Sequence, residues 1–88
     1  MFYVYCLQSE EFGDLYFGFT KDLKRRFKEH NQKLNFSTKR LAPWKIIYYE
    51  ACLNEDDAKR REKYLKTTQR RRMMKIRLKE YLYEKRKI

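Results

Sequence analysis

Two short apolar runs separated by a turn are the feature that most constrains the fold of this chain. Residues 2–8 and 15–20 are rich in aromatic side chains, which favours β-strands. The segment between them contains Gly13, which can adopt the positive φ of a tight turn. The pattern therefore predicts a β-hairpin. Side-chain alternation would place Tyr5 and Tyr16 on one side of that hairpin if the register allows.

A basic helix is expected directly after the hairpin. Thr20 and Asp22 can each cap a helix that runs to about residue 33. Its inward stripe at helical spacing would be Leu23, Phe27 and Leu34. Arg26 and His30 are four residues apart and flank this stripe. Both are therefore expected near the boundary between the helix and the sheet.

The rest of the chain predicts one more strand and two more helices. Residues 44–50 suit a strand of a buried sheet. Asn54 is a good N-cap for the helix that follows, and Glu62 lies on a face of that helix that is otherwise apolar or basic. A last, basic helix is expected over about residues 70–86. We expect a single domain over residues 1–88, with its core over about residues 2–66.

The distribution of charge indicates a polyanionic partner. The net charge is +11, and the last 30 residues carry 14 Lys/Arg against 3 Asp/Glu, so the whole excess lies there. A solvated helix face would also be basic, but charge this one-sided favours nucleic acid. We expect phosphate contacts from Lys21, Lys39, Arg40, Arg70, Arg71, Arg72, Lys75 and Arg77.

The two cysteines and the hydropathy favour a reducing cytoplasm. Cys6 and Cys52 are too few for a disulfide framework, and each lies in an apolar run where a buried thiol is expected. We see no signal peptide and no run near the ~20 apolar residues that span a membrane. A basic amphipathic helix could bind a membrane surface, but the charge-balanced first part of the chain gives that no support. No membrane partner is expected, and the sequence leaves the oligomeric state open.

Several residues are suited to chemistry on a phosphodiester. The planar guanidinium of Arg26 matches two phosphate oxygens, although a solvated helix arginine would look the same. His30, the only histidine, could relay a proton, orient the phosphate or simply be hydrogen-bonded at the edge of the core. Tyr5 and Tyr16 could position or deprotonate water. A phenol is a weak base unless cations or a metal stabilise its phenolate.

Glu62 is the candidate metal ligand. One carboxylate can hold one Mg²⁺ whose shell is completed by waters and a phosphate oxygen, but it is too little for a two-metal site. The alternative is an ion pair of Glu62 with Arg61 or Lys66.

In their order, these residues resemble the GIY-YIG nuclease superfamily. Residues 3–5, Tyr-Val-Tyr, are similar to its first motif, and residues 16–18, Tyr-Phe-Gly, to its second, with Phe17 in place of the usual isoleucine or valine. Residues 20–31 resemble the helix with the phosphate-binding arginine, and residues 58–66 resemble the metal-binding helix, with Glu62 at its glutamate. The small stand-alone bacterial members, related to the endonuclease domain of the repair nuclease UvrC, are matched further by Ser37-Thr38-Lys39, Pro43-Trp44-Lys45 and Tyr48-Tyr49-Glu50.

The resemblance implies an α/β fold of the α+β type, with a small three-stranded antiparallel sheet flanked by helices. It also implies one Mg²⁺ or Mn²⁺ ion at Glu62, a phosphate held by Arg26, and two tyrosines beside the attacking water. We favour Tyr16 as the base, with Tyr5 and His30 as positioning partners. The expected activity is metal-dependent endonucleolytic cleavage of DNA, at branched, nicked or damaged structures and with low sequence specificity.

The chain departs from the family pattern at three places, of which the first is common in the small members and the other two count against efficient catalysis. Tyr3 stands where the first motif has glycine, no asparagine follows Asn54, and residues 67–70 replace a glycine-containing turn. Many family nucleases have an asparagine after the glutamate. Its absence favours a nucleic-acid-binding module that kept the fold without turnover. The enzyme is favoured by the joint presence of Tyr5, Tyr16, Arg26, His30 and Glu62.

Overall fold

The computed structural model describes the backbone of residues 1–87 and the side chains of residues 1–83. Its centre is a sheet of β1 (Phe2–Ser9), β2 (Leu15–Thr20) and β3 (Trp44–Cys52) in the order β2-β1-β3. β1 pairs antiparallel with both neighbours. The three-stranded antiparallel sheet and the α+β class are thereby confirmed.

The β1–β2 hairpin has the register that brings the two tyrosines together. Gly13 takes a φ of +80° in the turn. Tyr5 lies opposite Gly18, and Leu7 lies opposite Tyr16. Opposed residues in an antiparallel pair point to the same side, and alternate residues along a strand do so as well. Tyr5 and Tyr16 therefore share one face of the sheet.

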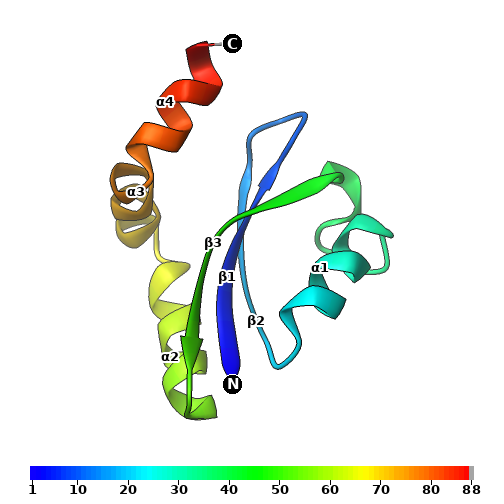
Figure 1. Cartoon of the computed structure of the whole chain (residues 1–88), viewed down its shortest axis with the longest axis vertical. Helices are drawn as coiled ribbons and strands as arrows, with labels where there is room; N and C mark the ends of the chain where they lie inside the picture. The colour runs from blue at the N-terminus through cyan, green and yellow to red at the C-terminus, as the bar shows by residue number, and fades with distance from the viewer. Residues whose placement is uncertain (88) are drawn as a thin grey trace.

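The helices cover both faces of this sheet. α1 (Leu23–Asn31) and the short 3₁₀ helix η1 (Lys39–Leu41) lie on one side, and α2 (Glu55–Leu65) and α3 (Thr68–Arg77) lie on the other (Figure 1). α4 (Lys79–Lys87) extends from the end of α3. β1 is buried on both of its faces because it is the central strand. The two edges of the sheet belong to β2 and β3.

Each face of the sheet has its own apolar cluster. The Tyr5 face packs Leu7 and Trp44 against residues of α1 and the loop before β3. The opposite face packs Val4, Cys6 and Phe17 against Ala58, Leu65 and Met74 of α2 and α3. Both cysteines are free thiols. No helix in the described part of the chain is long and apolar enough to cross a bilayer.

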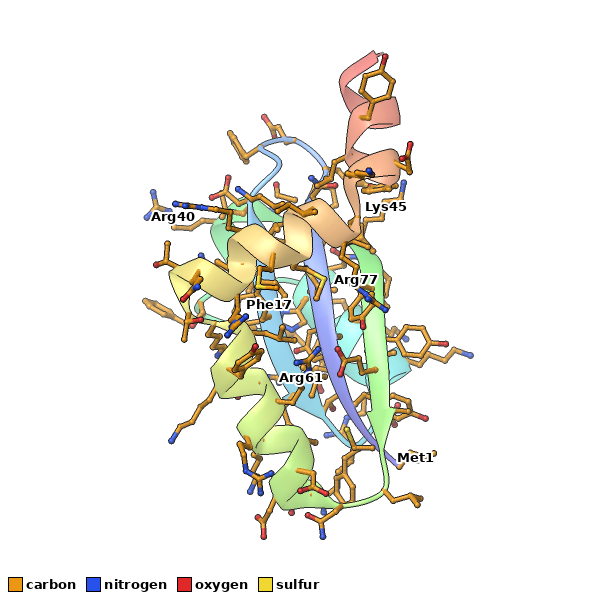
Figure 2. All side chains as sticks on the ribbon, turned by 90° about the vertical axis from the view of Figure 1, so that its left-hand side faces the viewer. Met1, Phe17, Arg40, Lys45, Arg61 and Arg77 are labelled. Carbon is orange, nitrogen blue, oxygen red and sulfur yellow. The ribbon has the colours of Figure 1, made fainter. Side chains whose placement is uncertain are left out.

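α3 crosses the sheet from one edge strand to the other. The Arg71 guanidinium lies 5.9 Å from the centre of the Phe17 ring in β2. At the other end of the helix, the Arg77 guanidinium lies 5.6 Å from the Tyr48 ring in β3. Figure 2 looks onto this face and shows Arg77 beside β3. The basic residues of α3 are therefore spread across the sheet.

Two expected helices have different limits in the structure. α1 ends at Asn31, because Lys33 takes a left-handed φ of +62° and the N–H groups of Lys33 and Leu34 close the helix on the carbonyls of His30 and Glu29. Leu34 is 69% exposed, so its expected place in the inward stripe was wrong. The single helix expected over about residues 70–86 is two helices, because α3 stops at Leu78.

The segment that joins α2 to α3 explains one departure from the family pattern. Lys66 ends α2 with φ −79°, and Thr67 follows in extended backbone with φ −70°. Neither residue needs the positive φ that glycine supplies. The Thr67 hydroxyl instead accepts a hydrogen bond from the Arg70 N–H and so caps α3. The turn without glycine is therefore compatible with the fold.

Candidate active site

A buried chain of hydrogen bonds joins β1, α1 and the segment before η1. The Tyr5 hydroxyl lies 2.8 Å from His30 Nε2, and His30 Nδ1 lies 2.7 Å from the Thr38 hydroxyl. All three residues are buried. Both nitrogens of the imidazole are therefore satisfied inside the protein, which fixes the ring plane. Thr38 in turn is held because its carbonyl accepts a hydrogen bond from the indole N–H of Trp44.

His30 is a neutral imidazole at physiological pH. Burial lowers its pKa to about 4, and the nearby Arg26 guanidinium acts in the same direction. A neutral imidazole has one donor and one acceptor nitrogen. It can therefore donate to one of the two hydroxyls and accept from the other. This geometry suits a residue that orients Tyr5.

Tyr5 is a neutral phenol held in one position. Burial raises its pKa to about 12, although the Arg26 guanidinium acts in the opposite direction by hydrogen bonding and charge. Its ring lies directly over Gly18, where an added Cβ would collide with the phenol. Gly18 is therefore required for the close approach of the Tyr5 ring to β2.

Tyr16 lies near His30 of α1 and near Lys66 at the end of α2. Its ring centre is 5.2 Å from that of His30, in an edge-on arrangement. The Lys66 ammonium, at the end of α2, lies 5.8 Å from the centre of the same ring. Tyr16 is half-buried, so its side chain is more accessible than that of Tyr5. Tyr16 is therefore the tyrosine of this pair that solvent can reach more easily.

Arg26 is at the surface beside Tyr5. Its guanidinium donates to Glu29 at 3.1 Å, and its side chain is 37% exposed. It lines a hollow of about 340 Å³ together with Phe19, Lys21 and Asp22. An arginine that is half-open to solvent and anchored by one carboxylate retains donors for a phosphate.

Glu62 reaches the site from α2, across the edge of the sheet. Its Oε2 lies 3.4 Å from the Lys66 ammonium, and its side chain is 22% exposed. Since Lys66 also lies over Tyr16, this ion pair connects Glu62 to the tyrosine side of the site. Of the two partners considered for Glu62, Lys66 is therefore the one it pairs with. Arg61 instead forms a two-pronged ion pair with Glu50, at 3.0 Å for each prong.

A single divalent ion fits the donor set at Glu62. No group of three or more His, Cys, Asp or Glu side chains that could hold a metal occurs in the described residues. One partly exposed carboxylate supplies one or two hard oxygen ligands, and Mg²⁺ commonly keeps several waters or phosphate oxygens. The Lys66 ammonium is the cation that stands beside this carboxylate in the structure.

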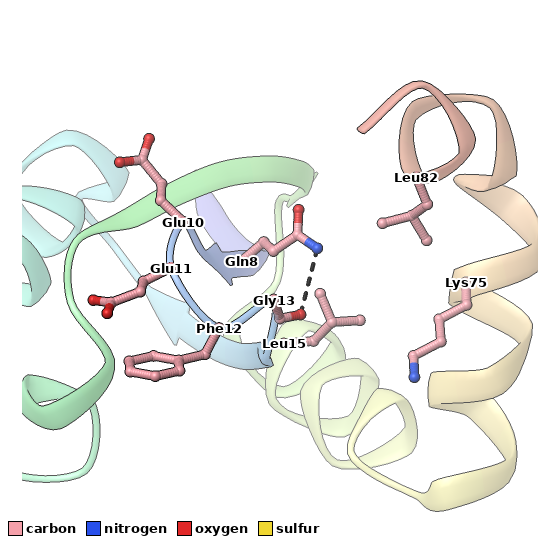
Figure 3. A pocket seen from close by; sticks show the side chains of 8 residues that line it. All are labelled: Gln8, Glu10, Glu11, Phe12, Gly13, Leu15, Lys75 and Leu82. Atoms are coloured by element: carbon pink, nitrogen blue, oxygen red, sulfur yellow. Dashed lines mark hydrogen bonds between the residues drawn. The ribbon is translucent and has the colours of Figure 1, made fainter. Parts of the chain in front are cut away.

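The basic residues expected to contact nucleic acid come from several elements. Lys39 and Arg40 belong to η1, and Lys21 follows β2. Arg70 lies 4.5 Å from the Tyr64 ring, whereas Arg71 and Arg77 lie at opposite ends of α3. Lys75 points into a groove of about 370 Å³ between α3, α4 and the hairpin turn, which is also lined by Glu10 and Glu11 (Figure 3).

Three further residues support the site without having been expected to take part in it, although Lys66 was considered as an ion-pair partner of Glu62. Thr38 holds His30, Lys66 links Glu62 to Tyr16, and Glu29 anchors Arg26. Two of these have a sequence signal, since Glu29 and Lys66 are three and four residues from their partners on a helix. Thr38 has none beyond its position in the motif at residues 37–39.

The chain was compared with families of known proteins. A family model described as the GIY-YIG catalytic domain matches residues 1–77. The chain belongs to the GIY-YIG family. The match extends beyond residue 66 and includes α3. Membership in the GIY-YIG family indicates a nuclease-type domain with a nucleic-acid substrate, and members of this family generally use a divalent metal.

The relatives are small bacterial proteins of similar length. A UPF0213 protein of Clostridium perfringens is 34% identical over 90 residues, covering 97% of this chain and 96% of the relative. A UPF0213 protein of Staphylococcus saprophyticus is 31% identical, covering 84% of this chain and 90% of the relative. A UPF0213 protein of Streptococcus agalactiae is 38% identical, covering 73% of this chain and 73% of the relative. No solved structure matches this chain. The expected membership in the GIY-YIG family, with small bacterial proteins as relatives, is confirmed.

Proposed function

We propose that this GIY-YIG protein is a metal-dependent endonuclease that hydrolyses phosphodiester bonds of DNA. The observation that carries the proposal is the arrangement around edge strand β2. Tyr5, Tyr16 and Arg26 lie on one side with His30, and Glu62 is linked to them from the other side through Lys66. A phosphate placed at this edge would meet an arginine, two phenols and a carboxylate.

The two tyrosines are suited to different roles. Tyr5 is buried, and its pKa of about 12 makes its phenolate costly, so we assign it to positioning together with His30. Tyr16 is more accessible and has the Lys66 ammonium near its ring. We assign the more accessible Tyr16 as the base that takes a proton from the attacking water.

Arg26 and Glu62 are assigned to the charge of the transition state. The Arg26 guanidinium would hold two oxygens of the phosphate while negative charge develops on them. Glu62 would hold one Mg²⁺ or Mn²⁺ ion, which when bound supplies Lewis-acid stabilisation of the leaving oxygen. The basic residues around the site are suited to phosphates rather than base edges. We therefore expect low sequence specificity and a preference for branched, nicked or damaged DNA.

Single-turnover cleavage of branched, nicked and plain duplex DNA with Mg²⁺ or Mn²⁺ tests this proposal. We expect metal-dependent cuts by the wild type that vanish in Glu62→Gln. Glu55→Gln is the matched control, because Glu55 lies on the same helix and pairs with Lys59 as Glu62 pairs with Lys66. Cleavage that persists in Glu62→Gln, or is lost equally in both variants, would contradict the metal-ligand role.

Arg26→Ala separates transition-state stabilisation from binding. We expect the variant to lose turnover on the order of 100-fold while DNA affinity changes little, because its main contact is made as charge develops. Equal losses in turnover and binding would make Arg26 a docking residue.

A non-catalytic nucleic-acid-binding module is the second candidate. It is favoured by the absence of an asparagine after Asn54 and by the ammonium of Lys66 beside Glu62. DNA binding without cleavage in the wild type, under every metal tried, would establish this alternative.

A further inference from the structure

Three lysines of α2 form a row beside the proposed metal ligand. Lys59, Lys63 and Lys66 are spaced by four and three residues, so they lie along one side of the helix, next to Glu62. The Lys59 ammonium lies 5.8 Å from the centre of the Phe19 ring, and that of Lys66 lies 5.8 Å from the Tyr16 ring. Both rings belong to β2, so the row follows the same sheet edge as the site.

These lysines are open to solvent and only lightly paired. The side chains of Lys59 and Lys66 are 58% and 44% exposed. Lys59 forms a loose ion pair with Glu55 at 3.8 Å, and Lys66 pairs with Glu62 at 3.4 Å. Within residues 1–83, no side chain forms an ion pair with Lys63. Exposed ion pairs of this kind are weak, so an incoming phosphate can compete for these ammonium groups.

Other cations in the same part of the chain have partners elsewhere. Arg61 is held by Glu50, and Arg77 lies over Tyr48 near the far edge of the sheet. Arg60 pairs with Asp57 at 3.2 Å. Within residues 59–66, the lysine row is thus the basic group that lies beside Glu62 and β2.

Two hollows provide a path across the edge of β2. One has a volume of about 570 Å³ and is lined by Phe19, Asp56, Lys59, Arg60, Glu62 and Lys63. The other is the hollow beside Arg26, and Phe19 lines it as well. A nucleic-acid strand lying over Phe19 would therefore pass from Glu62 to Arg26, the two residues assigned to the scissile phosphate.

We infer that Lys59, Lys63 and Lys66 bind successive phosphates of one nucleic-acid strand on its way into the site. This inference rests on the proposed function, since it takes the β2 edge as the place of cleavage. The partner is the sugar-phosphate backbone, because ammonium groups on flexible stems bind phosphate charge without reading bases.

The test is the salt dependence of DNA binding without divalent ions, so that cleavage is suppressed. A fluorescein-labelled duplex is titrated with the wild type and with Lys59→Gln/Lys63→Gln in chelator at several salt concentrations. Each phosphate contact contributes roughly 0.9 to the slope of log K against log salt, so the double variant should lose about 1.8 from this slope. Lys66 is left unchanged because it belongs to the proposed site.

The matched control is Lys45→Gln/Lys79→Gln. It removes the same charge from exposed lysines, one in β3 and one at the start of α4. Figure 2 shows Lys45 beside β3, the strand at the opposite edge from β2. We expect this variant to keep the wild-type slope to within a few tenths.

The outcomes separate the role of the lysine row from the nuclease proposal. Equal slopes in the two double variants, or no binding by the wild type, would overturn the proposal that the lysine row binds phosphates. If cleavage still depends on Glu62 when the slopes are equal, the nuclease proposal stands without that role. If only Lys59→Gln/Lys63→Gln flattens the slope but no metal supports cleavage, the lysine row binds phosphates on a non-catalytic module.

Discussion

His30 shows how one residue can organise the site without carrying charge. It is buried, both of its ring nitrogens have hydroxyl partners, and its ring packs against Tyr16. Protonation would place a charge in a desolvated position near the Arg26 guanidinium, which is why its pKa falls to about 4. The uncharged imidazole therefore holds the Tyr5 hydroxyl in place by a hydrogen bond.

The buried imidazole makes stability depend on pH. The unfolded chain takes up a proton at His30 below about pH 6.5, whereas the folded protein resists protonation until about pH 4, so stability falls as pH falls through this window. We expect a loss of about 2 kcal/mol in the free energy of unfolding between about pH 7 and about pH 5. Urea unfolding at these two pH values measures it.

Two further measurements make the assignment specific. His30→Gln should lose this pH dependence, and NMR titration of the only histidine should give a midpoint near pH 4. A midpoint near the ordinary histidine value of about 6.5 would contradict the buried, neutral state. The lowered pKa of Glu50, held down by hydrogen bonds from Arg61 and Tyr48 that outweigh its burial, adds a further loss only at lower pH.

At the scale of elements, the junction between α2 and α3 sets the position of the basic helix. The Thr67 hydroxyl donates to the Tyr64 carbonyl at 3.0 Å and accepts from the Arg70 N–H at 3.4 Å. It thus ends one helix and starts the next within a single residue. Met74 of α3 then packs against the sheet, with Arg71 at one edge and Arg77 at the other.

Thr67→Ala should destabilise the protein by about 1 kcal/mol, because the first turn of α3 loses its side-chain cap. Thr68→Ala is the control, since Thr68 is exposed and is the first residue inside the helix. The midpoint of urea unfolding distinguishes the two variants. If Thr68→Ala were as destabilising as Thr67→Ala, the capping role would be wrong.

At the scale of the whole molecule, the excess positive charge lies mainly over one face of the sheet. The excess of +11 lies in the last 30 residues, and the structure places the helices formed by most of them on the face opposite α1. A polyanion approaching the protein therefore meets a positive potential on the α2–α3 side. Such a field raises the association rate and is screened by salt.

Replacing Arg72 and Lys75 with Gln should slow DNA association several-fold at low salt, because both lie exposed on α3 and contribute to this field. Lys24→Gln/Lys28→Gln removes the same charge from the exposed side of α1 and should have a smaller effect. Stopped-flow fluorescence of a labelled duplex measures both rates. Similar association rates for the two variants would show that net charge, rather than its placement, controls approach.

The parts of the fold that could be predicted are those set by neighbouring residues. The hairpin, the strand after Pro43 and the caps at Asp22 and Asn54 follow from alternation, turn chemistry and short polar side chains. The end of α1 could not be predicted in this way. Lys33 adopts a left-handed conformation that its side chain does not signal, and Leu34 is left in solvent.

The sequence by itself determined the three strands, the caps at Asp22 and Asn54, and the one-sided charge, because each depends on local spacing or composition. Tertiary structure alone decided that Thr38 holds His30, that Arg61 pairs with Glu50 and that Lys66 lies over Tyr16. The residues in these contacts come from different elements or from a loop. They meet only after the register of the sheet and the positions of α1 and α2 on its two faces are fixed, and no local pattern in the chain encodes that geometry.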